Sequence, residues 1–347
     1  MPCFPRPAAL LLLLVMARLL ADREPTLDIY WIDSLGGGST LLVTPAGESI
    51  LIDAGNPGGR DSGRIQEVAT RVAGLRQIDH LIVTHLHTDH YGGAAELAAL
   101  LPIRQVHDNG IPDQDPDGRR DPSWPQRIRP YREMPVAGRN VVQAGGRLDL
   151  RQRPGSPPVG LRFVAARQQL ALNTNLLANA RGCDNLARRA PDTSDNANSI
   201  VSLVQFGDFR FFDGGDLTWN VEATLVCPLD QTGPVDVYQV NHHGLEVSNH
   251  PRLLQALSPT VAVFNNGPRK GGHPEVVRTL HQLQPRPAIY QVHRNLAAPQ
   301  ANADPAHLAN DGEPGGQWMR LTVAPDAREY TVTVPRTGHR QTFPTRK

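Results

Sequence analysis

Residues 84–93 read Thr-His-Leu-His-Thr-Asp-His-Tyr-Gly-Gly, and this stretch decides which folds and chemistries suit the rest of the chain. Four potential metal ligands fall within six residues: His85, His87, Asp89 and His90. Three imidazoles and a carboxylate at this spacing suit a divalent metal such as zinc. In an extended stretch His85, His87 and Asp89 would point to one side, and His90 would come round through the following glycines. A solvated polar loop is the alternative, which explains a single histidine better than this cluster.

The cluster follows an apolar segment, residues 81–83, so it is expected at the carboxyl end of a buried strand. Two later motifs have the same placement. Gly214-Gly215-Asp216 follows the apolar residues 209–212, and Asn241-His242-His243-Gly244 follows residues 235–240. Each motif alone is weak, because Asp-Gly turns and surface histidine pairs are ordinary. Their shared position adds Asp216, His242 and His243 to the candidate ligands.

Composition sets the limits on the rest of the chain. The 347 residues include 35 basic and 34 acidic ones, a net charge of +1, which argues against a uniformly basic nucleic-acid binder. Gly and Pro, 31 each, indicate a folded, loop-rich chain. Only Lys270 and Lys347 are lysines, and we attribute the excess of arginine to compositional bias.

Hydrophobic periodicity predicts strands interleaved with helices, which indicates sheets covered by helices. Helices are expected at 65–75, 94–101, 252–257 and 275–283. Strands are expected at 27–32, 40–44, 49–53, 78–83, 148–150, 161–165, 199–206, 209–212, 235–240, 261–264, 288–292, 319–323 and 330–334. Residues 108–140, with six prolines, are expected to be irregular, and 166–195 are hard to place.

These motifs carry a resemblance. Leu51-Ile52-Asp53-Ala54-Gly55, followed by the 84–93 stretch, Gly-Gly-Asp and His-His-Gly, resembles the metallo-β-lactamase fold superfamily. More narrowly, Asn196-Ala197-Asn198-Ser199, Gly272-His273-Pro274 and the glycine-rich residues 35–41 resemble the extracellular hydrolase domain of ComEC-type competence proteins and their secreted single-domain relatives. The resemblance covers residues 27–293. It implies an α/β fold, a four-layer αβ/βα sandwich with the metals at one edge of the sheets.

The resemblance also implies two divalent metal ions, Zn²⁺ being expected and Mn²⁺ the alternative. His85 and His87 would hold one ion, and Asp89 and His90, with either His242 or His243, the other. Asp216 would bridge both.

Two positions are less settled. The first ion's usual third histidine, in a Gly-His-Thr context, is absent, and Asp195, Asn196 and Asn198 occupy that neighbourhood. The first ion would therefore bind less tightly, or take Asp195 or water as a ligand. Asp53 is expected to support a ligating histidine by a hydrogen bond, the alternative being an ordinary aspartate at a strand end.

The expected reaction is hydrolysis, in which a metal-bound hydroxide attacks a phosphorus or carbonyl centre. Asp89 and His273 are the candidate catalytic residues, His273 as a substrate contact or proton donor to the leaving group. A surface histidine at a helix start is the alternative for His273. The main hypothesis is a phosphodiesterase or nuclease in the broad sense. A lactam, lactone or other ester hydrolase, and a non-catalytic metal-binding relative, are the alternatives.

The anionic-substrate hypothesis rests on residues 119–189, which contain 14 arginines against four acidic residues, a local charge of +10. Beside the metals, this segment would attract small or nucleic-acid-type anions. Arginine-rich composition spread over a solvated loop is the alternative.

The first 21 residues predict export. Residues 1–21 have the charged start, short apolar run and small residue of a signal peptide, and a misplaced start or a buried helix is the alternative. We therefore expect a periplasmic or secreted protein with a hydrolase domain at 22–334, a loose tail at 335–347, no membrane span in the mature chain and no stable protein partner. Cys183 and Cys227 could form a disulfide or remain thiols.

Overall fold

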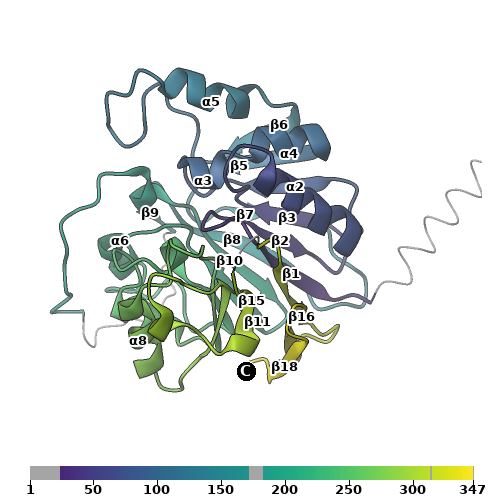
Figure 1. Cartoon of the computed structure of the whole chain (residues 1–347), viewed down its shortest axis with the longest axis vertical. Coiled ribbons are helices and arrows are strands. Elements are labelled where there is room, and N and C mark those ends of the chain that lie inside the picture. Colours follow the sequence, from purple (N-terminus) through teal and green to yellow (C-terminus); the bar gives the residue numbers. More distant parts are fainter. Residues whose placement is uncertain (1–23, 172–182, 313–314, 347) are drawn as a thin grey trace, which may run out of the picture.

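Two β-sheets of nine strands each form the centre of the molecule in the computed structural model (Figure 1), which describes residues 24–171, 183–312 and 315–346. The strand order in the first sheet is β18-β17-β16-β1-β2-β3-β4-β5-β6. Its strands are β1 (Leu27–Ile32), β2 (Thr40–Val43), β3 (Ser49–Ile52), β4 (Ile78–Ile82), β5 (Ile103–Asp108), β6 (Val136–Val141), β16 (Trp318–Val323), β17 (Glu329–Val334) and β18 (His339–Pro344).

The order in the second sheet is β15-β14-β13-β12-β11-β10-β8-β7, and β9 pairs with β8. Its strands are β7 (Arg147–Leu148), β8 (Val159–Ala166), β9 (Gln169–Leu170), β10 (Val201–Phe206), β11 (Phe209–Asp213), β12 (Val237–Gln239), β13 (Val261–Phe264), β14 (Ala288–His293) and β15 (Leu308–Asn310).

Helices cover the outer faces of both sheets (Figure 1). The α-helices are α2 (Arg60–Glu67), α3 (Thr88–Tyr91), α4 (Ala94–Leu100), α5 (Trp124–Glu133), α6 (Trp219–Thr224), α7 (Pro251–Leu257) and α8 (Pro274–Gln282). A π-helical turn η1 (Val68–Val72) continues α2, and the 3₁₀ turns are η2 (Asp195–Asn198), η3 (Asn241–Gly244), η4 (Pro299–Ala301) and η5 (Pro305–His307).

Strand β1 shows why the sheets are covered on both sides. Its side chains alternate between two faces, as they must in a strand. Leu27, Ile29 and Trp31 pack in the core between the sheets, where the Trp31 ring lies 6.0 Å from that of Phe211. Tyr30 instead packs on the outer face, in the core that α2, α4 and α5 complete. A third core joins α6, α7 and α8 to the second sheet. The expected four-layer αβ/βα sandwich is therefore confirmed.

Parallel strands bring the motifs to one edge. Strands β3 to β6 are parallel to one another, as are β11 to β14 in the other sheet. The segments that leave β4, β11 and β12 carry the three motifs, so their side chains emerge at the carboxyl ends of parallel strands.

The structure corrects two expectations. Residues 108–140 are not wholly irregular, because they contain α5 and β6. Trp124, Ile128 and Tyr131 of α5 are buried at helical spacing, and Pro125 lies in the first turn, where no helical N–H is lost. The prediction of a loose tail is also wrong, because residues 339–344 form β18, which pairs with β17 and is an edge strand of the first sheet. The residues from 335 onward thus include an ordered strand.

Three further expectations concern export and cysteine. The expected signal, residues 1–21, lies outside the described residues. Within the described ranges, no helix is long and apolar enough to cross a membrane. Cys183 and Cys227 form a disulfide that closes a loop with a sequence separation of 44. In a chain-entropy account, a loop of that size stabilises the fold by about 4 kcal/mol.

Candidate metal centre

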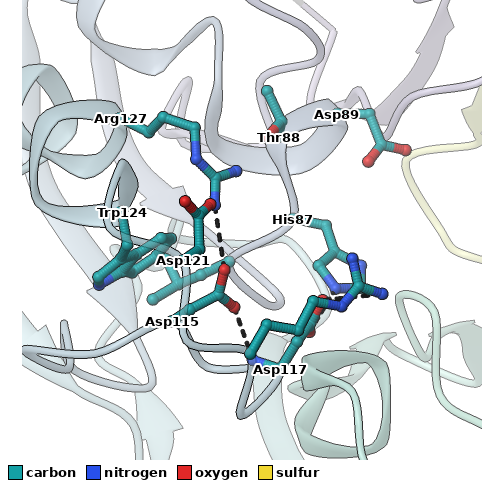
Figure 2. A pocket seen from close by; sticks show the side chains of 10 residues that line it. His87, Thr88, Asp89, Asp115, Asp117, Asp121, Trp124 and Arg127 are labelled. Carbon is teal, nitrogen blue, oxygen red and sulfur yellow. Dashed lines mark hydrogen bonds and ion pairs between the residues drawn. The ribbon is translucent and has the colours of Figure 1, made fainter.

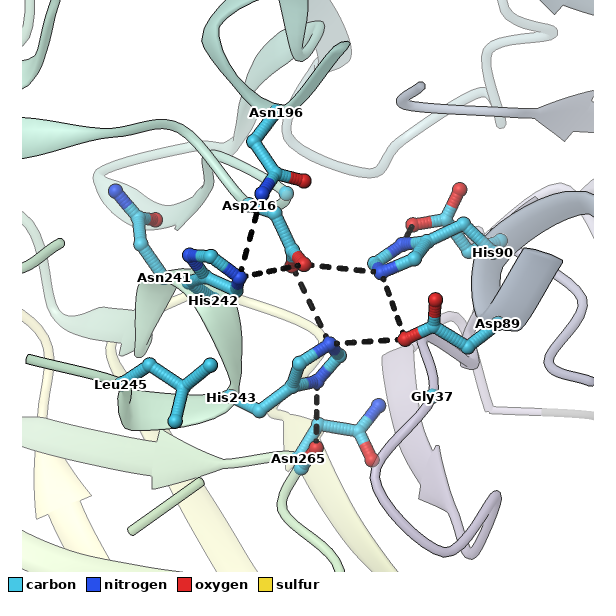
Figure 3. A network of polar contacts seen from close by, with 12 residues as sticks. Gly37, Asp89, His90, Asn196, Asp216, Asn241, His242, His243, Leu245 and Asn265 are labelled. Atoms are coloured by element: carbon cyan, nitrogen blue, oxygen red, sulfur yellow. Dashed lines mark hydrogen bonds and ion pairs between the residues drawn. The ribbon is translucent and has the colours of Figure 1, made fainter. Parts of the chain in front are cut away.

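Four side chains from three strand ends converge on one point (Figure 3). Asp89 and His90 lie in α3, Asp216 follows β11, and His243 lies in η3, with one ligand atom from each within 4.8 Å of the others. His90 Nε2 lies 3.2 Å from Asp216 Oδ2 and 3.5 Å from Asp89 Oδ2. His243 Nε2 lies 3.4 Å from Asp216 Oδ1 and 3.5 Å from Asp89 Oδ2. Two carboxylates and two imidazoles thus face a common centre.

The Nε2 atoms at this centre lack hydrogen bonds. Those of His85, His90 and His243 are buried and have no hydrogen-bond partner among the described residues. His243 is fixed in this orientation because its Nδ1 donates to the backbone oxygen of Asn265 over 3.0 Å. Buried polar atoms usually have a partner, and a metal-ligating histidine usually donates its other ring N–H to an oxygen. This donor set therefore fits a divalent metal ion.

Asp53 holds two of the histidines from behind. Its Oδ2 accepts hydrogen bonds from His90 Nδ1 at 2.7 Å and from Thr84 Oγ1 at 2.8 Å. Thr84 Oγ1 in turn lies 3.0 Å from His85 Nδ1. A Cβ on Gly38 would lie 2.7 Å from Asp53 Oδ2, so only glycine lets the early turn pass this close. The bonds of Asp53 leave it behind the cluster, outside the four converging residues.

His242 lies on a different side of Asp216 from His243 (Figure 3). Its Nε2 is 3.4 Å from Asp216 Oδ2 and 3.5 Å from the amide nitrogen of Asn196, while its Nδ1 lies 3.1 Å from Ser248 Oγ. His85 Nε2 is 3.9 Å from the same Asp216 oxygen. The sequence left open which of the two histidines joins Asp89 and His90, and in the structure that neighbour is His243.

His87 lies beside His85, with ring centroids 4.6 Å apart, but it directs its Nε2 at Asp117 and not at the cluster (Figure 2). Its Nε2 lies 2.8 Å from Asp117 Oδ1, which also accepts the backbone N–H of Asp195 over 2.9 Å. We expected His85, His87 and Asp89 to point to one side of an extended segment. That expectation was wrong because α3 begins at Thr88, so Asp89 turns with His90 instead.

Asp195 anchors the backbone of the histidine segment. Its Oδ2 accepts the N–H of Leu86 over 2.6 Å, and its Oδ1 accepts the side-chain amide of Asn198 over 3.0 Å. The first bond fastens η2 to the segment that carries His85 and His87, and the second lies within η2. Asp195 is not among the four converging residues.

The turn η3 is held in an uncommon backbone conformation. His242 and His243 both have φ of 55°, in the left-handed region that non-glycine residues rarely adopt. Buried Glu222 of α6 supports this segment, because its carboxylate accepts hydrogen bonds from Asn241 Nδ2 at 2.7 Å and from the His250 N–H at 2.6 Å. Strain of this kind persists only where surrounding contacts enforce it.

The site's charges favour the metal-binding forms of Asp89, Asp216 and His85 and the protonated forms of His90 and His243. Burial raises the pKa of Asp216, but the charges of His243 and His90 outweigh this and hold it well below its usual range. The pKa of Asp89 is also held well below its usual range, because His90 outweighs the effect of burial. Burial and the charge of His90 lower the pKa of His85, which is therefore neutral. Burial lowers the pKa of His90 and of His243, but the charges of Asp216 and the neighbouring carboxylates outweigh it and raise both pKa values. Because neutral imidazoles and ionised carboxylates are the states that ligate metals, a metal ion would displace protons from these two histidines.

His273 sits at the edge of the site. It is the N-cap of α8, where its Nδ1 accepts the N–H of Glu275 over 3.3 Å. Its Nε2 lies 4.0 Å from Glu246, and its side chain is 40% exposed. Helix capping accounts for this geometry without chemistry, and a proton-donor role stays a prediction.

A cleft of about 370 Å³ opens beside His87 (Figure 2). Its charged lining includes Asp89, Asp115, Asp117 and Asp121 against Arg119 and Arg127. Arg127 forms ion pairs with Asp115 and Asp121, and Arg119 lies 3.7 Å from Asp117. The described part of the arginine-rich segment therefore does not give this cleft an excess of positive charge.

Two charged residues in the site were not among our candidates. Lys270 forms an ion pair with Asp89 Oδ2, and Asp117 holds His87. Lys270 could have been noticed as an unusual lysine next to the Gly-Gly-His-Pro motif. Nothing in the sequence around Asp117 indicated its role, because the pairing depends on how the 109–121 loop folds over the site.

Comparison with known proteins agrees with the motifs. Residues 33–167 match the metallo-beta-lactamase superfamily. Recombination protein 2 of Haemophilus influenzae is 26% identical over 267 residues, which are 75% of this chain and 27% of that protein. Competence protein ComA of Neisseria gonorrhoeae is 23% identical over 232 residues, 67% of this chain and 26% of that protein. Ribonuclease Z of Bradyrhizobium diazoefficiens is 38% identical over 68 residues, 20% of this chain and 21% of that protein. The chain thus spans only about a quarter of the length of Recombination protein 2 and of Competence protein ComA.

Proposed function

We propose that this chain is a hydrolase that requires two divalent metal ions, on the basis of the metallo-β-lactamase superfamily match of residues 33–167 and of the geometry of the site. One observation carries the proposal. The buried Nε2 atoms of His85, His90 and His243 face ionised Asp216 without a hydrogen-bond partner among the described residues.

The residues divide into two ligand sets that share Asp216. Asp89, His90 and His243 would hold one ion. His85 and His242 would hold the other, with His87 joining through Nδ1, because its Nε2 is engaged by Asp117. Zn²⁺ suits this set of nitrogen and carboxylate ligands, and Mn²⁺ is the alternative.

The bound ions would activate a water for attack on an ester-type centre and stabilise the charge that develops there. The chain's own residues supply orientation. Asp53 fixes His90 directly and His85 through Thr84, and Asn265 fixes His243. Asp89 belongs to the cluster and also lines the cleft, so we assign its carboxylate to orient the attacking water. These supports keep the ligands in place before the substrate arrives.

We propose a phosphodiester as the substrate class. One relative is named a ribonuclease, and ribonucleases cleave phosphodiesters. In addition, the Lys270 ammonium lies directly on the candidate centre, where it could meet an anion. A lactam, lactone or other ester hydrolase is the alternative, and it would need no cation at this position.

A substrate panel tests the function. Protein loaded with Zn²⁺ or Mn²⁺ would be assayed with bis(p-nitrophenyl) phosphate, single-stranded DNA, nitrocefin and a simple lactone, with D216A as the inactive control. We expect turnover of the phosphodiesters, two metal equivalents by elemental analysis, and loss of both in D216A. A preference for the lactam or lactone would replace the substrate class, and a metal-loaded protein inactive on every substrate would support a non-catalytic metal-binding protein.

We also propose that the protein works outside the cytoplasm. The signal-like pattern of residues 1–21 supports this, and so does the Cys183–Cys227 disulfide, because such bonds persist in oxidising compartments. N-terminal sequencing of natively expressed protein should give a start near Asp22. A start at Met1 or Pro2 in cytoplasmic protein with free thiols would contradict the proposal.

A further inference from the structure

The cation at the metal centre is a lysine in a chain that otherwise uses arginine. Of the 35 basic residues only Lys270 and Lys347 are lysines, and Lys270 is the one within the described ranges. Arginine presents a rigid, planar set of donors, whereas lysine is a compact charge on a flexible stem. A chain with this bias would be expected to place arginine wherever a simple positive charge was sufficient.

The Lys270 backbone is fixed, while its side chain is partly exposed to solvent. The Lys270 oxygen accepts the N–H of Gly267 over 2.9 Å, and the next turn is joined to η3 by a 2.9 Å bond from Gly272 N to His243 O. The aliphatic stem crosses Gly36 so closely that a Cβ there would lie 3.1 Å from Lys270 Cβ. The side chain is 39% exposed.

The ammonium occupies an oxygen that the proposed metal ion also needs. Lys270 Nζ pairs with Asp89 Oδ2, and this same oxygen faces His90 Nε2 and His243 Nε2, 3.5 Å from each. A divalent cation bound by Asp89 would repel the ammonium and take its partner. The flexible stem allows the ammonium to leave toward solvent, because a lysine side chain can turn about several bonds while its backbone stays fixed.

We propose that Lys270 is the anion-binding residue of the site: it pairs with Asp89 until a metal ion binds, and then holds an anionic oxygen of the substrate next to the metals. The inference rests on the proposed hydrolase function and adds that the substrate carries a negative charge at the reacting group. A phosphodiester oxygen meets that requirement, and a neutral ester does not.

Three variants test the role of Lys270. K270M keeps a flexible stem without the charge, K270R keeps the charge, and R269M removes a charge from the exposed neighbour on the same loop. Zn²⁺ affinity would be measured by competition with a chromophoric chelator. Binding of inorganic phosphate to the metal-loaded protein would be measured by calorimetry, so that neither measurement requires turnover.

The expected results have opposite signs. K270M should bind Zn²⁺ about threefold to tenfold more tightly, because no ammonium competes for Asp89, and should bind phosphate about tenfold more weakly, as expected for one lost charge-assisted hydrogen bond. K270R should recover part of the phosphate affinity, and R269M should change both affinities by less than about twofold.

Two results would overturn the proposal. Weaker Zn²⁺ binding in K270M would show that Lys270 supports the ligands instead of competing with the metal. Equal phosphate affinity in wild type, K270M and R269M would show that it does not receive the anion. Inactivity of the wild type on every panel substrate would refute the hydrolase function, and the two titrations would still decide the role of Lys270.

Discussion

The two sides of Asp216 differ in how completely they are built. On one side, Asp89, His90 and His243 lie with Asp216 within 4.8 Å of one another. On the other, His85 is 3.9 Å from the shared carboxylate, and His87 faces Asp117. His242 Nε2 lies 3.4 Å from the carboxylate on this second side. We call the first side the compact side and the second the open side. On the compact side a cation would displace Lys270 from Asp89, and on the open side it would bind His87 through Nδ1, because Asp117 engages Nε2.

The difference follows from which elements carry the ligands. Asp89 and His90 are neighbours on α3, which directs both toward the centre, while His85 and His87 lie in the loop before it. The superfamily resemblance implies a third histidine for this side, in the neighbourhood of residues 195–198, just before β10. Asn196 lies there instead and presents its side-chain amide to His242. We therefore expect the Asp89–His90–His243 side to fill first and the His85–His87–His242 side to bind more weakly.

The largest effect should come from breaking the compact side. In H243A and D89A, we expect loss of the compact-side ion, weaker binding of the open-side ion because the two share Asp216, and a decrease in kcat of at least about a thousandfold, because catalysis depends on this centre. The ligands lie at strand ends, outside the three apolar cores, so thermal unfolding should remain cooperative. Elemental analysis, kinetics and circular dichroism would test this, and an H243A protein that keeps both equivalents would contradict our division of the ligands.

The next effect separates the two adjacent histidines. H242A should lose one metal equivalent and keep the other, because its Nε2 faces only the open side of Asp216. We expect affinity for the second ion to fall by about tenfold to a hundredfold. Co²⁺ titration, followed by absorption spectroscopy, would distinguish H242A from H243A. Identical titrations for the two variants would mean that the sides are not separate sites.

A third prediction concerns Glu222, which supports the turn shared by both sides. Burial raises the pKa of Glu222 to about 7 in the folded protein, against 4.5 for an ordinary glutamate. The folded state therefore retains a proton that the unfolded chain releases. The stability from this group is complete below the unfolded pKa and is lost as pH rises through the folded pKa, at up to about 1.4 kcal/mol per pH unit.

Neutral E222Q isolates this contribution. With metals chelated, the free energy of unfolding would be measured by urea at pH 5, 6 and 7. The wild type should lose stability relative to E222Q over this range. E222Q should be about 1 kcal/mol less stable than the wild type at pH 5, because the NH₂ group of glutamine cannot accept the His250 N–H, whereas the second oxygen of the protonated Glu222 carboxyl can. Parallel pH curves for the two proteins would show that Glu222 does not titrate in this range.

The sequence could predict which residues converge better than how they divide between the two sides. The His-x-His-x-Asp-His spacing and the two glycine-flanked motifs identified all four converging residues, because strand ends of parallel sheets meet at one edge. It could not decide between His242 and His243, since their directions depend on two left-handed residues in η3. It also missed the pairing of His87 with Asp117, which lie 30 positions apart in sequence.

Charge was the least predictable feature. The count of arginines in 119–189 predicted a segment that attracts anions. Electrostatic attraction falls with distance, however, and several of the described arginines of this segment pair with carboxylates at different places in the fold. Arg139 is paired with Asp108 against the core, and Arg151 lies near Glu48, away from the four converging residues. One lysine outside that segment contacts the centre instead. Composition over a window therefore says little about the field at a site until the fold is known.

The smallest effect should come from Asp117, whose pairing with His87 characterises the open side. In D117A, His87 loses the acceptor that fixes its ring, so we expect affinity for the second metal ion to fall by about tenfold and affinity for the first to stay unchanged. D121A is the matched control, because Asp121 lines the same cleft but pairs with Arg127. Stepwise Zn²⁺ titration would resolve the two affinities. If Asp117 instead keeps His87 away from the metal, D117A will bind the second ion more tightly than D121A does, and the open side will then be one that the protein holds apart until Asp117 releases the ring.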